Sequence, residues 1–240
     1  MNLLIDIGNT RIKFAIASDQ IVETGFLPEF SEIEIDKLIR QKGGFNSCIV
    51  SAVRDLDQGM INNIKTRFSN FLILDENTMI PVKNNYQSKS SLGKDRLAAI
   101  VGAHNIFNKS HVLVIDFGTA VTFDLLEGEN GYMGGTISPG LSTRFRALNE
   151  FTGKLPLFDK KETDLFIGTD TESAIITGVQ NGMIFETQGY ISYLEKKYPG
   201  LKVILTGGDA DFFAKYLKST IFAEPNLVFI GLNTILQYNA

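Results

Sequence analysis

The chain has 240 residues, 44% of them hydrophobic and 21% charged, which is typical of a globular protein with one or two cores. Its net charge of −4 and the lack of a basic stripe argue against a nucleic-acid-binding role. We see no signal peptide and no apolar run near the roughly 18 residues of a membrane span, so we expect a cytoplasmic protein with no membrane partner. Cys48 is the only cysteine, which fits a reducing compartment.

The first half of the chain predicts alternating strands and helices. Short apolar runs predict strands at 2–7, 12–17, 48–53 and 71–75, with another short strand before residue 31. Helical spacing predicts helices within 31–44, within 57–68 and from Lys94 onwards. Residues 76–92 are polar and irregular.

The second half repeats the pattern. Strands are expected at 111–117, 120–126 and 202–206, and helices at 141–151, 171–198 and 211–219. The segment 131–140 is rich in glycine, and 226–239 predicts a strand followed by a closing helix. The long helix contains Gly178, Gly182 and Gly189, which suggests close packing against another helix, either within the same domain or across a subunit interface.

The two halves begin with nearly the same phrase. Asp6-Ile7-Gly8-Asn9-Thr10 aligns with Asp116-Phe117-Gly118-Thr119-Ala120, and 116 − 6 gives a spacing of 110 residues. We therefore expect a duplication, with one half at 1–109 and the other at 110–240. Alternating strands and helices predict an α/β fold with a mixed sheet in each half, and the cleft between two such halves is a preferred place for a small ligand.

The first hairpin has the composition of a phosphate-binding turn. Its backbone N–H groups, hydroxyl and amide suit phosphate oxygens, and the lysine on the return strand can reach the same anion. Asp6, at the strand end, can hold a hydrated Mg²⁺. An ordinary hairpin is the alternative, since Gly-Asn-Thr is good turn chemistry. The candidate residues are Asp6, Gly8, Asn9, Thr10, Arg11 and Lys13.

Two further turns add to this pattern. The second hairpin supplies Asp116, Gly118 and Thr119, although Phe123 stands where the spacing would place a counterpart of Lys13. Gly207 and Gly208 follow a predicted strand and would let the backbone lie against a planar ring such as a purine. A simple turn between strand and helix is the alternative for this pair.

Together these motifs resemble the phosphate-1, phosphate-2 and adenosine motifs of the acetate and sugar kinase/Hsp70/actin superfamily. Within it the chain is similar to the type III pantothenate kinases. The narrower resemblance rests on Gly93-Lys94-Asp95-Arg96, on the segment 134–141 and on Thr171 to Gly178, and it covers residues 2 to about 235. It implies two duplicated ribonuclease H-like (actin-like ATPase) domains, ATP with Mg²⁺, and phosphorylation of pantothenate to 4′-phosphopantothenate, the first step of coenzyme A biosynthesis.

Asp95 is the candidate general base. It lies in the first turn of a predicted helix, where an acid is also favoured simply by the helix dipole. Phosphoryl transfer needs a carboxylate that orients the attacking hydroxyl, and the family's proposed base falls on this residue. The resemblance also implies that Tyr86, Gly93, Lys94, Asp95 and Arg96 contact pantothenate. An ordinary loop residue is the alternative for Tyr86.

The resemblance implies three further features. Asp116 would help to bind a monovalent cation (K⁺ or NH₄⁺), and Thr119 would contact ATP. Thr171 would contact pantothenate across the interface of a homodimer, while a helix N-cap is its alternative role. The helix 171–198 is the candidate dimer interface.

The sequence leaves two other functions open. One is a non-catalytic accessory transcription regulator of the same family, and the intact set Asp6, Asp95, Arg96 and Asp116 favours the enzyme over it. The other is a sugar or carboxylate kinase of the same superfamily, against which the Gly-x-Asp-Arg motif and the short chain argue.

Overall fold

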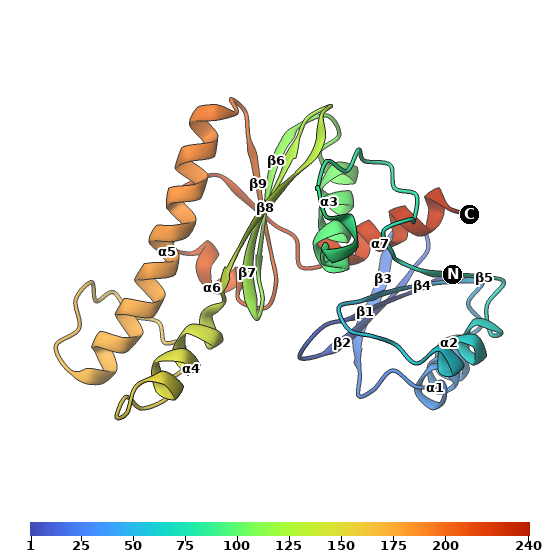
Figure 1. Ribbon diagram of the computed structural model, residues 1–240, viewed down its shortest axis with the longest axis horizontal. Helices are drawn as coiled ribbons and strands as arrows, with labels where there is room; N and C mark the ends of the chain where they lie inside the picture. The colour runs from blue at the N-terminus through green and yellow to red at the C-terminus, as the bar shows by residue number, and fades with distance from the viewer. The chain divides into compact units, whose positions relative to one another are not determined.

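Two five-stranded mixed sheets organise the chain, which a computed structural model describes over residues 1–240 (Figure 1). Contacts divide the chain into two units. The first unit comprises Met1–Lys109, Glu129–Met133 and Asn226–Ala240, and the second comprises Ser110–Gly128 and Gly134–Pro225.

The sheet of the first unit has the strand order β3-β2-β1-β4-β5. Its strands are β1 (Asn2–Ile7), β2 (Ile12–Ala17), β3 (Ile21–Leu27), β4 (Ser47–Ala52) and β5 (Asn70–Ile73). Its helices are α1 (Glu32–Lys42), α2 (Gln58–Lys65), α3 (Lys94–Ile106) and α7 (Leu227–Tyr238), and a 3₁₀ turn spans Lys89–Ser91.

The second sheet repeats this order. Read from its other end, the second sheet runs β8-β7-β6-β9-β10. The strands β6 to β10 therefore occupy the same positions in their sheet as β1 to β5 do in the first. The strands are β6 (His111–Phe117), β7 (Ala120–Glu127), β8 (Gly131–Pro139), β9 (Lys202–Thr206) and β10 (Ile221–Ala223). The helices are α4 (Leu141–Phe151), α5 (Thr171–Lys197) and α6 (Ala210–Ala214). The expected duplication and fold class are confirmed.

Helices cover both faces of the first sheet. Alternate residues of β1 pack with α1 and α2 in one apolar cluster, and the other face carries α3 and α7 (Figure 1). The two helices α3 and α7 approach closely at Gly231, which has no side chain. A Cβ at this position would lie 1.8 Å from the Ala98 carbonyl oxygen. This packing holds α3, and with it the Gly-x-Asp-Arg motif, against the sheet.

The core of the second unit lies between its sheet and the helices α4, α5 and α6. In Figure 1 the long helix α5 flanks this sheet. A Cβ at Gly178, Gly182 or Gly189 would have no heavy atom within 4 Å. These three glycines therefore do not pack within their own domain, whereas the other face of α5 does, through residues such as Val179 and Met183.

The prediction for the C-terminal segment was partly wrong. Helix α7 begins at Leu227 and leaves no strand within 226–239, and the last strand lies earlier, at Ile221–Ala223. The run Leu227–Leu232 is almost continuously apolar, so its pattern alone cannot distinguish a buried strand from a buried helix. None of the helices has both the length and the apolar composition needed to cross a membrane.

Candidate functional site

The first hairpin places an acidic residue opposite a basic one. In the antiparallel pairing of β1 with β2, Asp6 lies opposite Lys13, and the turn is closed by the Gly8 N–H donating to the Arg11 carbonyl at 3.1 Å. Gly8 has little room for a side chain, since a Cβ there would lie 3.2 Å from that same carbonyl oxygen. The backbone and side chains of Asn9 and Thr10 form the exposed tip of the turn.

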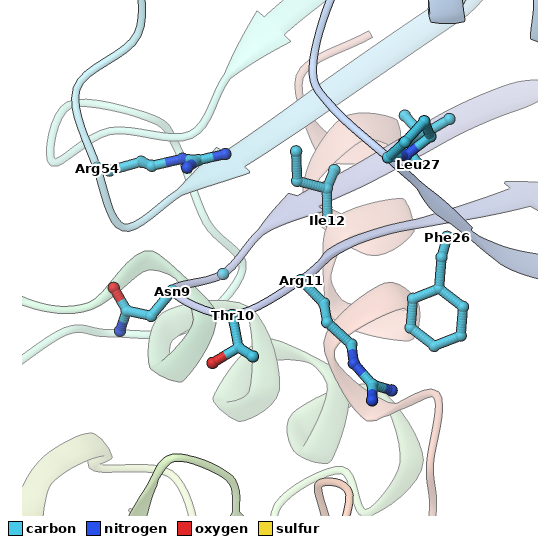
Figure 2. A pocket seen from close by; sticks show the side chains of 9 residues that line it. Asn9, Thr10, Arg11, Ile12, Phe26, Leu27 and Arg54 are labelled. Atoms are coloured by element: carbon cyan, nitrogen blue, oxygen red, sulfur yellow. The ribbon is translucent and has the colours of Figure 1, made fainter.

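A cavity of about 400 Å³ opens on this turn (Figure 2). It is lined by Gly8, Asn9, Thr10, Arg11, Ile12, Phe26, Leu27, Pro28 and Arg54. Figure 2 shows Arg54 reaching towards the hairpin from one side, while Arg11 extends beside Phe26, with its guanidinium carbon 5.4 Å from the ring centroid. The cavity therefore combines backbone amides, a hydroxyl and two cations, the groups that bind an anion.

Arg54 is a candidate that the sequence analysis missed. It follows β4, the parallel neighbour of β1, and the Val53 N–H donates to the Ile7 carbonyl at 3.1 Å, which sets the chain beside the hairpin. The side chain of Arg54 is exposed and forms no ion pair. No local signal marks this position, because only the pairing of β1 with β4 brings it near the turn.

Asp6 is a buried carboxyl in an unfavourable electrostatic setting. Burial, together with the smaller effect of the negative charge of Asp95, raises the pKa of Asp6 from its ordinary value near 3.8 to about 6. Lys13 and the hydroxyl of Ser51, which donates to Asp6 Oδ1 at 3.2 Å, act in the opposite direction. The first unit thus brings Asp6, Lys13 and Asp95 together, as a site for a cation and phosphate requires.

Asp95 lies in the first turn of α3, as predicted. Its Oδ1 accepts a hydrogen bond from the Arg96 N–H at 2.8 Å, which fixes the carboxylate over the start of the helix. A Cβ at Gly93 would lie 2.5 Å from this same oxygen, so glycine at the N-cap leaves room for the carboxylate.

Three further candidates from the sequence lie here: Lys94 and Arg96 belong to the first turn of this helix, and Tyr86 lies beside it. Arg96 is buried and its guanidinium carbon is 5.6 Å from the centroid of the Tyr86 ring, a cation–π contact. Lys94 forms an ion pair with Glu76 at 3.7 Å. Tyr86, Asp95 and Arg96 therefore form one group of side chains in the first unit.

The second unit holds the other turn. Its hairpin pairs Asp116 with Thr122, one residue before the Phe123 that spacing suggested, because this turn is one residue shorter than the first. A threonine thus stands where the first hairpin has Lys13, and the second turn lacks that positive charge. The Gly118 N–H donates to the Ala120 carbonyl at 3.1 Å, so a glycine N–H closes this turn too, across one residue fewer than in the first hairpin.

Close backbone packing fixes this second turn. The Thr119 carbonyl accepts from the Gly140 N–H at 3.0 Å and from the Thr143 hydroxyl at 2.7 Å. Gly207 has a φ of +93°, and a Cβ there would lie 2.3 Å from Asp116 Oδ1, so only glycine fits. The candidate phosphate and adenosine turns of the second unit therefore lie side by side, while Gly208 faces open space.

Thr171 is exposed and is the first residue of α5. The N-cap is Asp170, whose side chain accepts from the Ser173 N–H at 2.8 Å in a capping box. The alternative of Thr171 as the N-cap is therefore wrong by one residue.

Comparisons with known proteins agree with this arrangement. A family model described as type III pantothenate kinase matches residues 2–193. Proteins named type III pantothenate kinase from Bacteroides fragilis and Phocaeicola vulgatus are 41% and 42% identical to the chain. Each alignment covers 100% of this chain, with 98% and 99% of the respective relative.

Solved structures show the same fold at lower identity. A Campylobacter jejuni protein assigned to the Baf family of transcriptional activators has a TM-score of 0.63 at 24% identity, covering 99% of this chain and 98% of that one. A polyphosphate/ATP-glucomannokinase from an Arthrobacter strain has a TM-score of 0.53 at 13% identity, with full coverage of both chains.

The raised pKa of Asp6 predicts a pH-dependent stability. Its folded-state pKa exceeds its unfolded-state pKa, so ionising it opposes folding, and this carboxyl reduces stability increasingly as the pH rises towards and through 6. The Asp6→Asn variant removes that charge. We expect its gain in unfolding free energy over the wild type to grow by about 1 kcal/mol between about pH 5 and about pH 8, measured by urea unfolding.

The matched control is Asp19→Asn, at an exposed carboxylate of the same unit. Its effect should be the same at both pH values. A gain for Asp6→Asn that does not change with pH would contradict the raised pKa.

Proposed function

The chain belongs to the type III pantothenate kinase family, whose members phosphorylate pantothenate with ATP and a divalent metal in coenzyme A biosynthesis, and from that premise we propose which residues perform the reaction. Asp95 is the general base. The observation that carries this proposal is that its carboxylate, fixed over Gly93 by the Arg96 N–H, lies close enough to Asp6 to raise the pKa of that carboxyl.

The first hairpin binds the phosphate chain of ATP. Gly8, Asn9 and Thr10 line the cavity beside the turn, and Arg11 supplies positive charge there. Lys13, opposite Asp6 in the strand pairing, adds a second positive charge to the same hairpin. Arg54 adds a cation at the opposite side of the same cavity. Amides and cations directed at one anion stabilise the charge that develops during phosphoryl transfer.

Asp6 would hold Mg²⁺, through water. Mg²⁺ prefers one or two carboxylates together with water and phosphate oxygens, and Asp6 with its buried oxygens fits that donor set. A bound divalent cation would also neutralise the repulsion between Asp6 and Asp95, and it would draw charge from the transferred phosphoryl group.

The turns of the second unit are proposed to contact the nucleotide as well. Gly118 and Thr119 contact phosphate, and Gly207 and Gly208 border the adenosine, supported by the positive φ and close packing of Gly207. Asp116 holds a monovalent cation, K⁺ or NH₄⁺, and the support for this finer assignment is its carboxylate at the end of β6 beside Gly207.

Pantothenate lies beside the start of α3. Tyr86 packs on it, and Gly93, Lys94 and Arg96 contact its polar groups. The support is that Tyr86 contacts Arg96, whose N–H donates to Asp95, and that Gly93 and Lys94 adjoin Asp95 in the chain. Asp95 accepts the proton of the pantothenate hydroxyl as that oxygen bonds to the γ-phosphorus. The bond from the γ-phosphorus to the bridging oxygen breaks, and ADP leaves with that electron pair.

Replacing the base tests this assignment. Asp95→Asn keeps the size of the side chain but cannot accept the proton, so we expect kcat for pantothenate to fall by about 10²- to 10⁴-fold. The measurement is a coupled ADP-release assay with pantothenate and a panel of sugars. Asp19→Asn is the matched control and should retain full activity.

Two results would count against the proposal in different ways. Undiminished turnover in Asp95→Asn would exclude this residue as the base. If the wild type released no ADP with pantothenate at any K⁺ or NH₄⁺ concentration, the kinase assignment itself would fail for this chain.

One face of α5 is proposed as the interface of a homodimer. Gly178, Gly182 and Gly189 face open space, and at helical spacing among them lie Phe185 and Tyr193, exposed by 57% and 67%. A flat stripe of glycines edged by exposed aromatic rings suits close packing of two α5 helices. Thr171 begins the same helix, and we propose that it contacts pantothenate bound to the partner subunit.

A charge on this face should separate the subunits. We expect the wild type to sediment as a dimer of the 26.6 kDa chain and Gly182→Glu to sediment as a monomer, because burying an unpaired carboxylate costs several kcal/mol. Gly153→Glu, at an exposed glycine with equal room for a side chain, is the control and should remain dimeric. A monomeric wild type, or a dimeric Gly182→Glu, would refute this interface.

A further inference from the structure

Tyr132 is none of the candidate site residues predicted from the sequence, yet it contacts the proposed pantothenate group. Its side chain is fully buried, and its ring stacks on Tyr86 with the centroids 5.9 Å apart and the planes inclined by 4°. Tyr86 in turn contacts the guanidinium of Arg96 at 5.6 Å. A buried ring is thus joined through Tyr86 to the residue that follows Asp95.

Tyr86 has little local structure to hold it. It lies in the irregular stretch between β5 and α3, where only a 3₁₀ turn at Lys89–Ser91 is regular, and its side chain is half-buried. Its own N–H donates to the Asn84 side chain at 3.0 Å. Without a helix or strand to fix its backbone, the direction of the ring depends on what packs against it.

The segment that carries Tyr132 provides this support. The Tyr132 N–H donates to the Lys83 carbonyl at 2.9 Å, and its carbonyl accepts from the Asn85 N–H at 3.0 Å. The preceding Gly131 has a φ of +94°, and a Cβ there would lie 2.2 Å from the Lys83 carbonyl oxygen. The Asn85 side chain also donates to the Asn130 carbonyl at 2.7 Å.

We propose that Tyr132 is a positioning residue for pantothenate binding, because it holds the ring of Tyr86 in the orientation that faces both Arg96 and the substrate. The inference rests on the proposed roles of Tyr86 and Arg96. Stacked aromatic pairs gain about 0.5–1.5 kcal/mol beyond burial, which corresponds to roughly a 2- to 12-fold change in affinity. Tyr132 acts on binding and makes no contact with the reacting atoms.

The kinetic test compares Tyr132→Met with Tyr132→Phe. Methionine fills a buried space of irregular shape but has no planar ring, whereas phenylalanine keeps the ring. We expect Tyr132→Met to raise KM for pantothenate about 2- to 12-fold, with KM for ATP and kcat within about twofold of the wild type. Tyr132→Phe should restore the wild-type KM for pantothenate.

Three results would overturn the proposal: an unchanged KM for pantothenate in Tyr132→Met, an equal rise in the KM values of both substrates, or a Tyr132→Phe variant as impaired as Tyr132→Met. If Tyr132→Met does not fold, Tyr132→Leu replaces it. Failure of both to fold while Tyr132→Phe folds would make Tyr132 a residue of the core alone, which also overturns the proposal.

A second measurement does not depend on activity. The chain contains no tryptophan, so Tyr86→Trp introduces a single fluorescent reporter at the supported position. We expect its anisotropy without substrate to fall when Tyr132→Met is added and to stay high with Tyr132→Phe. If the wild type failed to phosphorylate pantothenate, the proposed function would fail while this readout still tested whether Tyr132 orders residue 86. Equal anisotropy in the two double variants would overturn the positioning role.

Discussion

The burial of Asp6 beside a second carboxylate is the constraint on which the first unit depends. A carboxyl at the end of a central strand loses water, and the charge of Asp95 makes its ionisation harder still. Such a pair weakens the empty fold at neutral pH. Under the proposed function, a divalent cation held between these carboxylates and phosphate would make the pair favourable. Under the proposed function, stability of the free protein is given up for binding of the charged substrate complex.

The duplicated fold explains why two similar turns differ. Both hairpins follow the first strand of a sheet with the same strand order, and both close with a glycine N–H donating across the turn. The first pairs its aspartate with Lys13, and the second pairs its aspartate with Thr122. The first turn thus carries the positive charge of Lys13. The second turn lacks this charge and packs against Gly207, which fits its proposed contacts to the nucleotide.

Local patterns were sufficient to predict much of the fold. The strands β1 and β2, the start of α3 at Lys94 and the long helix α5 all follow from short apolar runs, glycine turns and helical spacing. The strand proposed at the start of 226–239 failed because a continuous apolar run has no period. Its helical state depends on Gly231 packing against Ala98, a contact between residues far apart in the chain.

The candidate site also contains residues that sequence motifs reveal and residues that only contacts between distant parts of the chain bring to the site. The motifs Asp-x-Gly and Gly-x-Asp-Arg could be recognised because their residues are adjacent in sequence. Arg54 and Tyr132 could not, because strand pairing brings the first to the hairpin and backbone pairing with Lys83 and Asn85 brings the second to Tyr86. The raised pKa of Asp6 also depends on a charge far along the chain, at Asp95.

The most direct test of the account is a carbon-13 NMR titration of the Asp6 carboxyl in the wild type and in Asp95→Asn. We predict a pKa of about 6 in the wild type, and a lower pKa in the variant because the neighbouring negative charge is gone. An Asp6 pKa near its ordinary value of 3.8 in the wild type, or one that Asp95→Asn leaves unchanged, would contradict the paired carboxylates at the centre of the proposed mechanism.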